Sequence, residues 1–93
     1  MADLSRLREA IDQIDGQIRE LYLKRMRMVD EVAQIKEKTK EPILDVNREA
    51  EIVFKLTEAF PDQRILPYYR RVLQTILETS KDFQQELGTR CES

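Results

Sequence analysis

The sequence predicts an all-α domain with three helices, the first of them very long. Only two glycines and three prolines interrupt the 93 residues, and the stretches between them are rich in good helix formers. Apolar residues recur at alternating intervals of three and four, which is the period of an amphipathic helix. Because no internal repeat or long linker divides the chain, we expect a single domain over residues 1–93.

The first helix is predicted over about residues 4–38. Ten positions with 3-4 spacing form one stripe, and nine of them are apolar: Leu4, Leu7, Ile11, Ile14, Ile18, Leu21, Arg25, Met28, Val32 and Ile35. Gly16 lies off this stripe and costs roughly 1 kcal/mol relative to alanine, which is too little to end the helix.

Two shorter helices follow, predicted over residues 46–60 and 65–87. Asp45 is a plausible N-cap for the second helix, which is expected to stop before Pro61. Pro67 suits the first turn of the third helix, because proline needs no backbone hydrogen bond there.

The length of the first helix predicts self-association. A helix of about 35 residues is roughly 50 Å long. A compact monomer of this size has a radius of gyration of about 12 Å. Since the two shorter helices cannot cover the whole apolar stripe, we expect the uncovered part to pack against a second copy of the chain.

Composition excludes several classes of function. Eighteen acids against 16 bases give a net charge of −2, so neither a nucleic acid nor a membrane surface is an expected partner. The sequence has no histidine and a single cysteine, Cys91, which argues against metal sites, catalytic triads and disulfides. No apolar run resembles a signal peptide or a membrane span, so we expect a cytoplasmic protein without a cofactor.

Polar residues interrupt the apolar stripes on all three predicted helices. Arg25 does so on the first, Glu49 on the second, and Ser80 and Gln84 on the third. Lys36 lies on the same side as Arg25, because their separation along the sequence is close to three helical turns. An inward-facing charge needs a partner or a ligand. Together these residues predict one polar, mostly cationic pocket between the helices.

Each of these residues also has an ordinary structural explanation. Arg25 alone would pair with a carboxylate and reach solvent at its tip. Ser80 alone would bond back to a helix carbonyl, and Lys36 or Gln84 would lie on a solvated face. Glu49 alone would pair with a basic neighbour on its own helix. The pocket is favoured because all three helices break their pattern with hydrogen-bonding groups.

Arg8 precedes Arg25 by a distance of about 25 Å along the axis of a straight helix, and the two differ by about 100° around it. It can approach such a pocket only from a second, antiparallel copy. By themselves, Arg8 and Arg48 would be surface charges and Asp45 a helix cap.

The polar residues form an ordered set with intervals of 17, 11, 9, 3, 1, 31 and 4 residues, namely Arg8, Arg25, Lys36, Asp45, Arg48, Glu49, Ser80 and Gln84. With the opening segment 7–15, this set resembles the all-α, AroQ-type chorismate mutases, either monofunctional or at the N-terminus of bifunctional mutase–prephenate dehydratase proteins. The resemblance implies an intertwined six-helix homodimer with two active sites.

The resemblance also implies roles in binding chorismate. Arg8 of the partner chain and Arg25 would hold the two substrate carboxylates, with help from Ser80. Asp45 and Glu49 would bind the ring hydroxyl.

Two residues are implied to be catalytic. Lys36 and Gln84 would meet the ether oxygen, Arg48 would support the site, and Val32 and Leu77 would be apolar walls. The implied reaction converts chorismate to prephenate by an intramolecular Claisen rearrangement, in which no proton moves and no covalent enzyme intermediate forms. The absence of histidine is therefore no obstacle to this chemistry.

Two alternatives remain at the level of the sequence. Isochorismate–pyruvate lyase resembles these mutases in fold and substrate, but as a family it lacks the equivalent of Glu49. A non-catalytic helical dimerisation module would need only the first apolar stripe, and it leaves Glu49, Ser80 and Gln84 unexplained.

Overall fold

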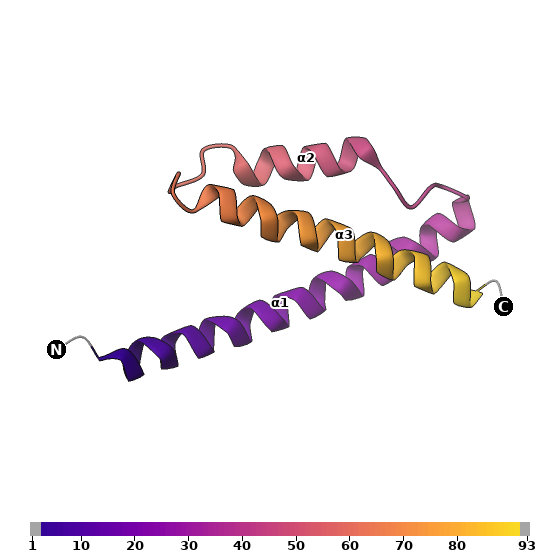
Figure 1. Cartoon of the computed structure of the whole chain (residues 1–93). Helices are drawn as coiled ribbons and strands as arrows, with labels where there is room; N and C mark the ends of the chain where they lie inside the picture. The colour runs from indigo at the N-terminus through magenta and orange to yellow at the C-terminus, as the bar shows by residue number, and fades with distance from the viewer. Residues whose placement is uncertain (1–2, 92–93) are drawn as a thin grey trace.

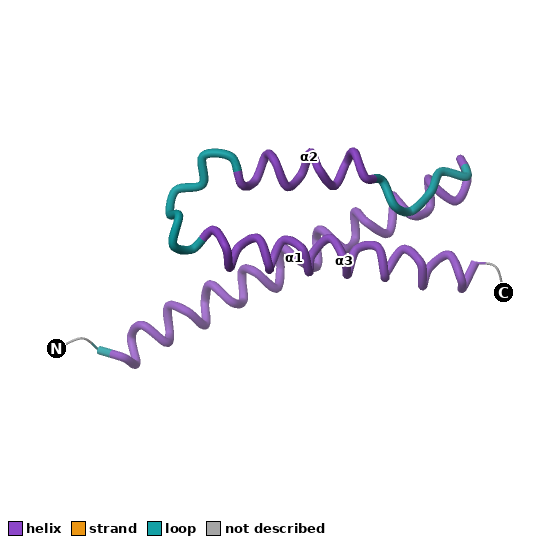
Figure 2. Tube along the Cα trace, turned by 45° about the horizontal axis from the view of Figure 1, so that its top comes forward, coloured by secondary structure: helices purple, strands orange, loops and turns teal. Residues whose placement is uncertain are grey.

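Three helices make up the part of the chain that the structure, a computed structural model, describes, residues 3–91 (Figure 1). Helix α1 spans Leu4–Thr39, α2 spans Val46–Thr57 and α3 spans Leu66–Cys91. The all-α prediction is confirmed, since only loops connect these helices within residues 3–91 (Figure 2). No helix in that range has the length and apolar character needed to span a membrane.

Helix α1 is continuous over 36 residues, as its apolar stripe predicted. Asp3 caps its start, because the Asp3 carboxylate accepts a hydrogen bond from the backbone N–H of Ser5 at 3.0 Å. Gly16 does not interrupt the helix. Helix α1 ends at Thr39, because the next residue, Lys40, adopts a left-handed conformation with a φ of 61°.

The ends of the two shorter helices differ from the predicted ones. Asp45 caps α2 as predicted, but the helix ends at Thr57 and not at residue 60. The early end follows from Ala59, whose φ of 52° is left-handed, and from Pro61, which disfavours a helical residue before it. Helix α3 continues through Gly88 to Cys91, four residues beyond the predicted end.

Helix α3 is the central element, because it packs against both α1 and α2. Among the side chains that the structure describes, the buried hydrophobic ones are Leu73 and Leu77 on α3, with exposed fractions of 3% and 5%. The Tyr22 hydroxyl on α1 donates a 2.7 Å hydrogen bond to Thr79, which fixes the crossing of α1 and α3. As Figure 1 shows, the N-terminal part of α1 extends away from this crossing.

The apolar stripe at the N-terminal end of α1 is exposed in the single chain. We call this surface the α1 face, and each of its members is more than half exposed: Leu4, Leu7, Ile11, Ile14, Ile18 and Leu21. The chain measures 59 × 28 × 14 Å and has a radius of gyration of 17.0 Å, well above the value of about 12 Å expected for a compact chain of this length. One copy therefore leaves much of its apolar surface in water.

Candidate active site

The three helices line a half-open pocket of about 260 Å³ beside the crossing of α1 and α3. Seven of the eight predicted site residues line this pocket: Arg25, Lys36, Asp45, Arg48, Glu49, Ser80 and Gln84. Val32 and Leu77 contribute apolar wall, as expected from the sequence. Stripe-breaking polar residues from three helices thus share one cavity.

The charge of this pocket is positive. Arg25, Lys36, Arg48 and Lys81 carry four positive charges among the lining residues, against two negative charges on acidic side chains, which leaves a net charge of +2. The described residues contain no group of three or more cysteine, aspartate or glutamate side chains arranged to hold a metal ion. Such a cavity suits an anionic ligand with two negative groups.

Arg25 is held in place by α3. Its Nη1 donates a hydrogen bond to the Ser80 Oγ, and this hydroxyl donates in turn to the Ile76 carbonyl at 2.7 Å. Ser80 is only 6% exposed. The hydrogen bond to the Ile76 carbonyl is the one expected for an ordinary helical serine. The hydrogen bond from Arg25 gives the same hydroxyl a second function, which is to hold the guanidinium. A guanidinium has five N–H donors, so Arg25 keeps four for an anion.

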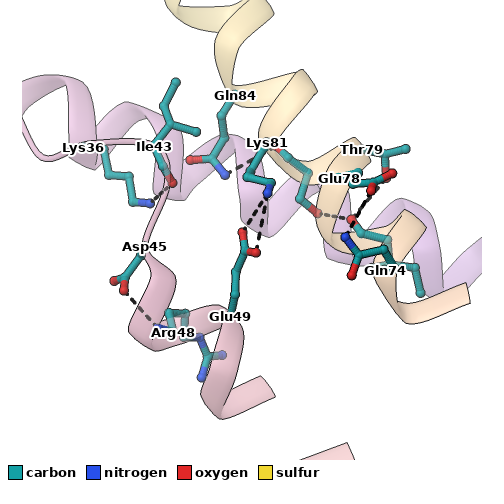
Figure 3. Close-up of polar contacts among 12 residues, drawn as sticks. Lys36, Ile43, Asp45, Arg48, Glu49, Gln74, Glu78, Thr79, Lys81 and Gln84 are labelled. Carbon is teal, nitrogen blue, oxygen red and sulfur yellow. Dashed lines mark hydrogen bonds and ion pairs between the residues drawn. The ribbon is translucent and has the colours of Figure 1, made fainter. Parts of the chain in front are cut away.

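Lys36 and Gln84 lie together at the end of the pocket next to the α1–α2 loop (Figure 3). The Lys36 ammonium donates to the Ile43 carbonyl at 2.9 Å, which turns it toward the loop and leaves two of its N–H groups for a ligand. Gln84 is 7% exposed, so it is not the solvated surface residue of the ordinary structural explanation.

The Gln84 amide is incompletely satisfied. Its Nε2 donates to the Ser80 carbonyl at a long 3.4 Å, and its buried Oε1 has no hydrogen-bond partner among the described residues. An unpaired buried acceptor costs about 1–3 kcal/mol. A half-turn of the amide gives up the long bond to Ser80 and presents an N–H donor in place of the oxygen. The amide is therefore available for a ligand.

The start of α2 supplies the acidic side of the pocket. The Asp45 carboxylate accepts from the Arg48 backbone N–H at 2.9 Å, so Asp45 is the helix cap that the ordinary structural explanation expected. The Arg48 side chain pairs with Glu51 at 2.9 Å and is largely exposed. Lys55, and then Arg48, hold the pKa of Glu51 below its ordinary value. Arg48 is thus turned partly outward, with its charge shared by an acid outside the pocket.

Glu49 pairs with a residue that the sequence interpretation missed. Its carboxylate lies 3.2 Å from the ammonium of Lys81 on α3, and not beside a basic neighbour on α2 (Figure 3). Lys81 lines the pocket. The signal was present in the sequence, because Lys81 follows Leu77 by four residues and precedes Gln84 by three, which places it on the same stripe.

Arg8 is the one predicted site residue that this pocket does not include. It lies on the exposed N-terminal part of α1, several turns before Arg25. Over that stretch a straight helix separates the two residues by about 25 Å. Within one chain the two arginines therefore cannot bind the same small molecule.

Comparison with known proteins identifies the family of this chain. Residues 7–85 match the family described as chorismate mutase type II, and this segment includes every residue that lines the pocket. The chain belongs to the type II chorismate mutase family. The family is one of isomerases of the chorismate mutase class.

Two relatives carry the same domain within longer proteins. The chain is 35% identical over 86 residues to the bifunctional chorismate mutase/prephenate dehydratase of Buchnera aphidicola subsp. Schizaphis graminum (strain Sg), covering 91% of this chain and 22% of the relative. It is 30% identical over 89 residues to the protein of that name from Aquifex aeolicus (strain VF5), covering 87% of this chain and 25% of the relative. The chain thus spans about a quarter of these relatives or less. No solved structure matches it significantly.

Proposed function

We propose that the chain converts chorismate to prephenate in the pocket between α1, α2 and α3, by orienting and polarising the substrate. The observation that carries this proposal is the pocket itself, in which Arg25, Lys36, Glu49, Ser80 and Gln84 converge with an excess of positive charge. Chorismate is a dianion with an ether bond to be broken. Its two carboxylates can pair with the cations of the pocket, and its ether oxygen can accept hydrogen bonds from the free N–H donors.

The first task of the site is to hold a reactive conformer. Arg25 binds one substrate carboxylate through N–H groups that Ser80 leaves free, and Ser80 keeps the guanidinium in one orientation. Asp45 and Glu49 bind the ring hydroxyl. The contacts to the substrate carboxylates bring the two carbon atoms that form the new bond close together, and such positioning supplies several kcal/mol of the catalytic effect.

The second task is to stabilise the transition state. The ether C–O bond breaks while the new C–C bond forms, so negative charge develops on the ether oxygen. Lys36 and the turned amide of Gln84 donate hydrogen bonds to that oxygen in a largely buried environment. No step moves a proton, which agrees with a pocket lined by neither histidine nor cysteine.

A second copy of the chain completes the site. The exposed α1 face supports a homodimer in which the two α1 helices pack antiparallel and the three helices of each chain interlock with those of the other. Antiparallel packing brings Arg8 of the second copy toward the pocket of the first. Arg8 then binds the second substrate carboxylate opposite Arg25.

The test of the proposed function is direct assay of purified protein with chorismate. Formation of prephenate with no release of pyruvate is the expected result. Pyruvate would identify an isochorismate–pyruvate lyase and overturn the proposal, although Glu49 in the pocket and the family match both favour the mutase. The absence of any turnover would also overturn it, and would leave dimerisation through the α1 face as the function.

Ile14→Glu is expected to dissociate the homodimer. Ile14 lies on the α1 face, and burial of an isoleucine side chain is worth about 1.5–3 kcal/mol. Since the symmetric interface loses two of them, we expect the dissociation constant to rise about a thousandfold. Analytical ultracentrifugation measures this change. Gln13→Glu introduces the same charge at an exposed position outside the α1 face and is the control, which should remain dimeric. A dimeric Ile14→Glu variant would contradict the proposed interface.

A further inference from the structure

The Glu49–Lys81 ion pair joins α2 to α3 inside the pocket. The Lys81 ammonium lies 3.2 Å from Oε2 of Glu49 and 3.5 Å from Oε1, and the side chains of Lys81 and Glu49 are 30% and 28% exposed, respectively. Other ion pairs, such as Lys55–Glu51, join near neighbours in the sequence and are more exposed. The 32 residues between Glu49 and Lys81 make this pair a tertiary contact. It therefore fixes a pocket carboxylate relative to another helix.

We propose that Lys81 is a positioning residue, which acts through Glu49 and not by touching the substrate. This inference rests on the proposed function, in which Glu49 binds the ring hydroxyl. Lys81 approaches both oxygens of the Glu49 carboxylate, and an ionised carboxylate has about four acceptor sites. At least two acceptor sites stay free, and the ion pair aims them into the pocket.

Lys81 has a second effect, which is electrostatic. Glu49 is a half-buried negative charge in a pocket that receives a dianion. Without Lys81 this carboxylate would repel the substrate, and its orientation would be set only by the flexible glutamate chain. With Lys81 in place, the carboxylate offers acceptors for a hydroxyl at little cost in repulsion. The ion pair thus favours binding of a substrate that is both dianionic and hydroxylated.

The kinetic signature of this role is a change in KM. The hydroxyl contact is the same in the bound substrate and in the transition state, so its loss weakens both equally. We expect Lys81→Met to raise KM for chorismate about tenfold and to change kcat by less than about threefold. Lys81→Arg keeps a cation that can reach both carboxylate oxygens and should stay within about threefold of the unmodified chain.

A matched control separates this role from the general loss of an ion pair. Lys55→Met removes a 3.0 Å pair with Glu51 on the exposed side of α2, outside this pocket, and should leave both kinetic parameters unchanged. Circular dichroism at the assay temperature shows whether each variant is folded. If Lys81→Met is not folded, Lys81→Gln is measured in its place with the same expected change in KM.

A double-mutant cycle with Glu49→Gln tests whether Lys81 acts through Glu49. If it does, Lys81→Met changes kcat/KM by less than about twofold once Glu49 has been replaced. An equal tenfold loss in both backgrounds would mean that Lys81 contacts the substrate directly, and it would overturn the proposal. An unchanged KM for Lys81→Met, or an equal change for Lys55→Met, would overturn it as well. An unmodified chain that does not turn over chorismate refutes the proposed function itself, and this is measured first.

Discussion

Arg8→Ala chains and Arg25→Ala chains, each nearly inactive alone, should recover activity when they are mixed. Each arginine makes charge-assisted hydrogen bonds to one substrate carboxylate in the proposed site. Two such bonds are worth about 3–6 kcal/mol, so each single variant should lose about a thousandfold in kcat/KM. The recovery follows from the separation of Arg8 from its own chain's pocket, which contains Arg25 but not Arg8.

The expected extent of recovery follows from the symmetry of the dimer. In a mixed dimer, one site combines an intact Arg25 with an intact Arg8 from the other chain, while the second site lacks both. Random exchange of equal amounts makes half of the dimers mixed, so about a quarter of all sites become active. A chorismate assay before and after subunit exchange measures this fraction.

One control mixture makes the mixing experiment decisive. In the control, Arg25→Ala chains are mixed with Ser80→Ala chains, and we expect a much smaller gain over the starting activities than for Arg8→Ala with Arg25→Ala. Arg25 and Ser80 line the same pocket of one chain, so every site of the mixed dimer still lacks one of the two residues. Absence of recovery for Arg8→Ala with Arg25→Ala, after exchange has been demonstrated, would contradict the shared site.

The sequence predicted the helices and the inward polar residues because both follow from local periodicity. The 3-4 spacing of apolar residues over α1 was sufficient to predict its full length, and the same spacing identified Arg25, Ser80 and Gln84 as residues that face the other helices. The Asp45 cap was also predictable, because capping depends on residues within one turn.

Features that depend on tertiary contacts were not predictable in this way. The early end of α2 at Thr57 depends on the left-handed Ala59, a conformation for which alanine has no intrinsic preference. The partner of Glu49 was expected on α2, but the packing of α3 brings Lys81 to it from 32 residues away. Periodicity gives the face of a helix and not the neighbour that this face meets.

The strongest chemical test of the site is Gln84→Glu, which should make turnover depend on acidic pH. The introduced side chain has nearly the same shape as glutamine, but it donates a hydrogen bond only when it is protonated. Gln84 is 7% exposed and shares the end of the pocket with Lys36, so in our proposal the ionised form places an acceptor at the developing charge. At neutral pH we expect kcat/KM to fall about a hundredfold or more, as for loss of an oxyanion donor.

The direction of the pH dependence is fixed by which form is active. Above the pKa of the introduced carboxyl, the protonated fraction falls tenfold for each pH unit, so kcat/KM should rise tenfold for each unit of acidification until that pKa is reached. Gln84→Met cannot donate at any pH and should stay inactive throughout, while Gln63→Glu places the same change at an exposed position outside the pocket and should keep the unmodified profile. An active Gln84→Glu variant with a flat profile would mean that Gln84 does not donate to the ether oxygen.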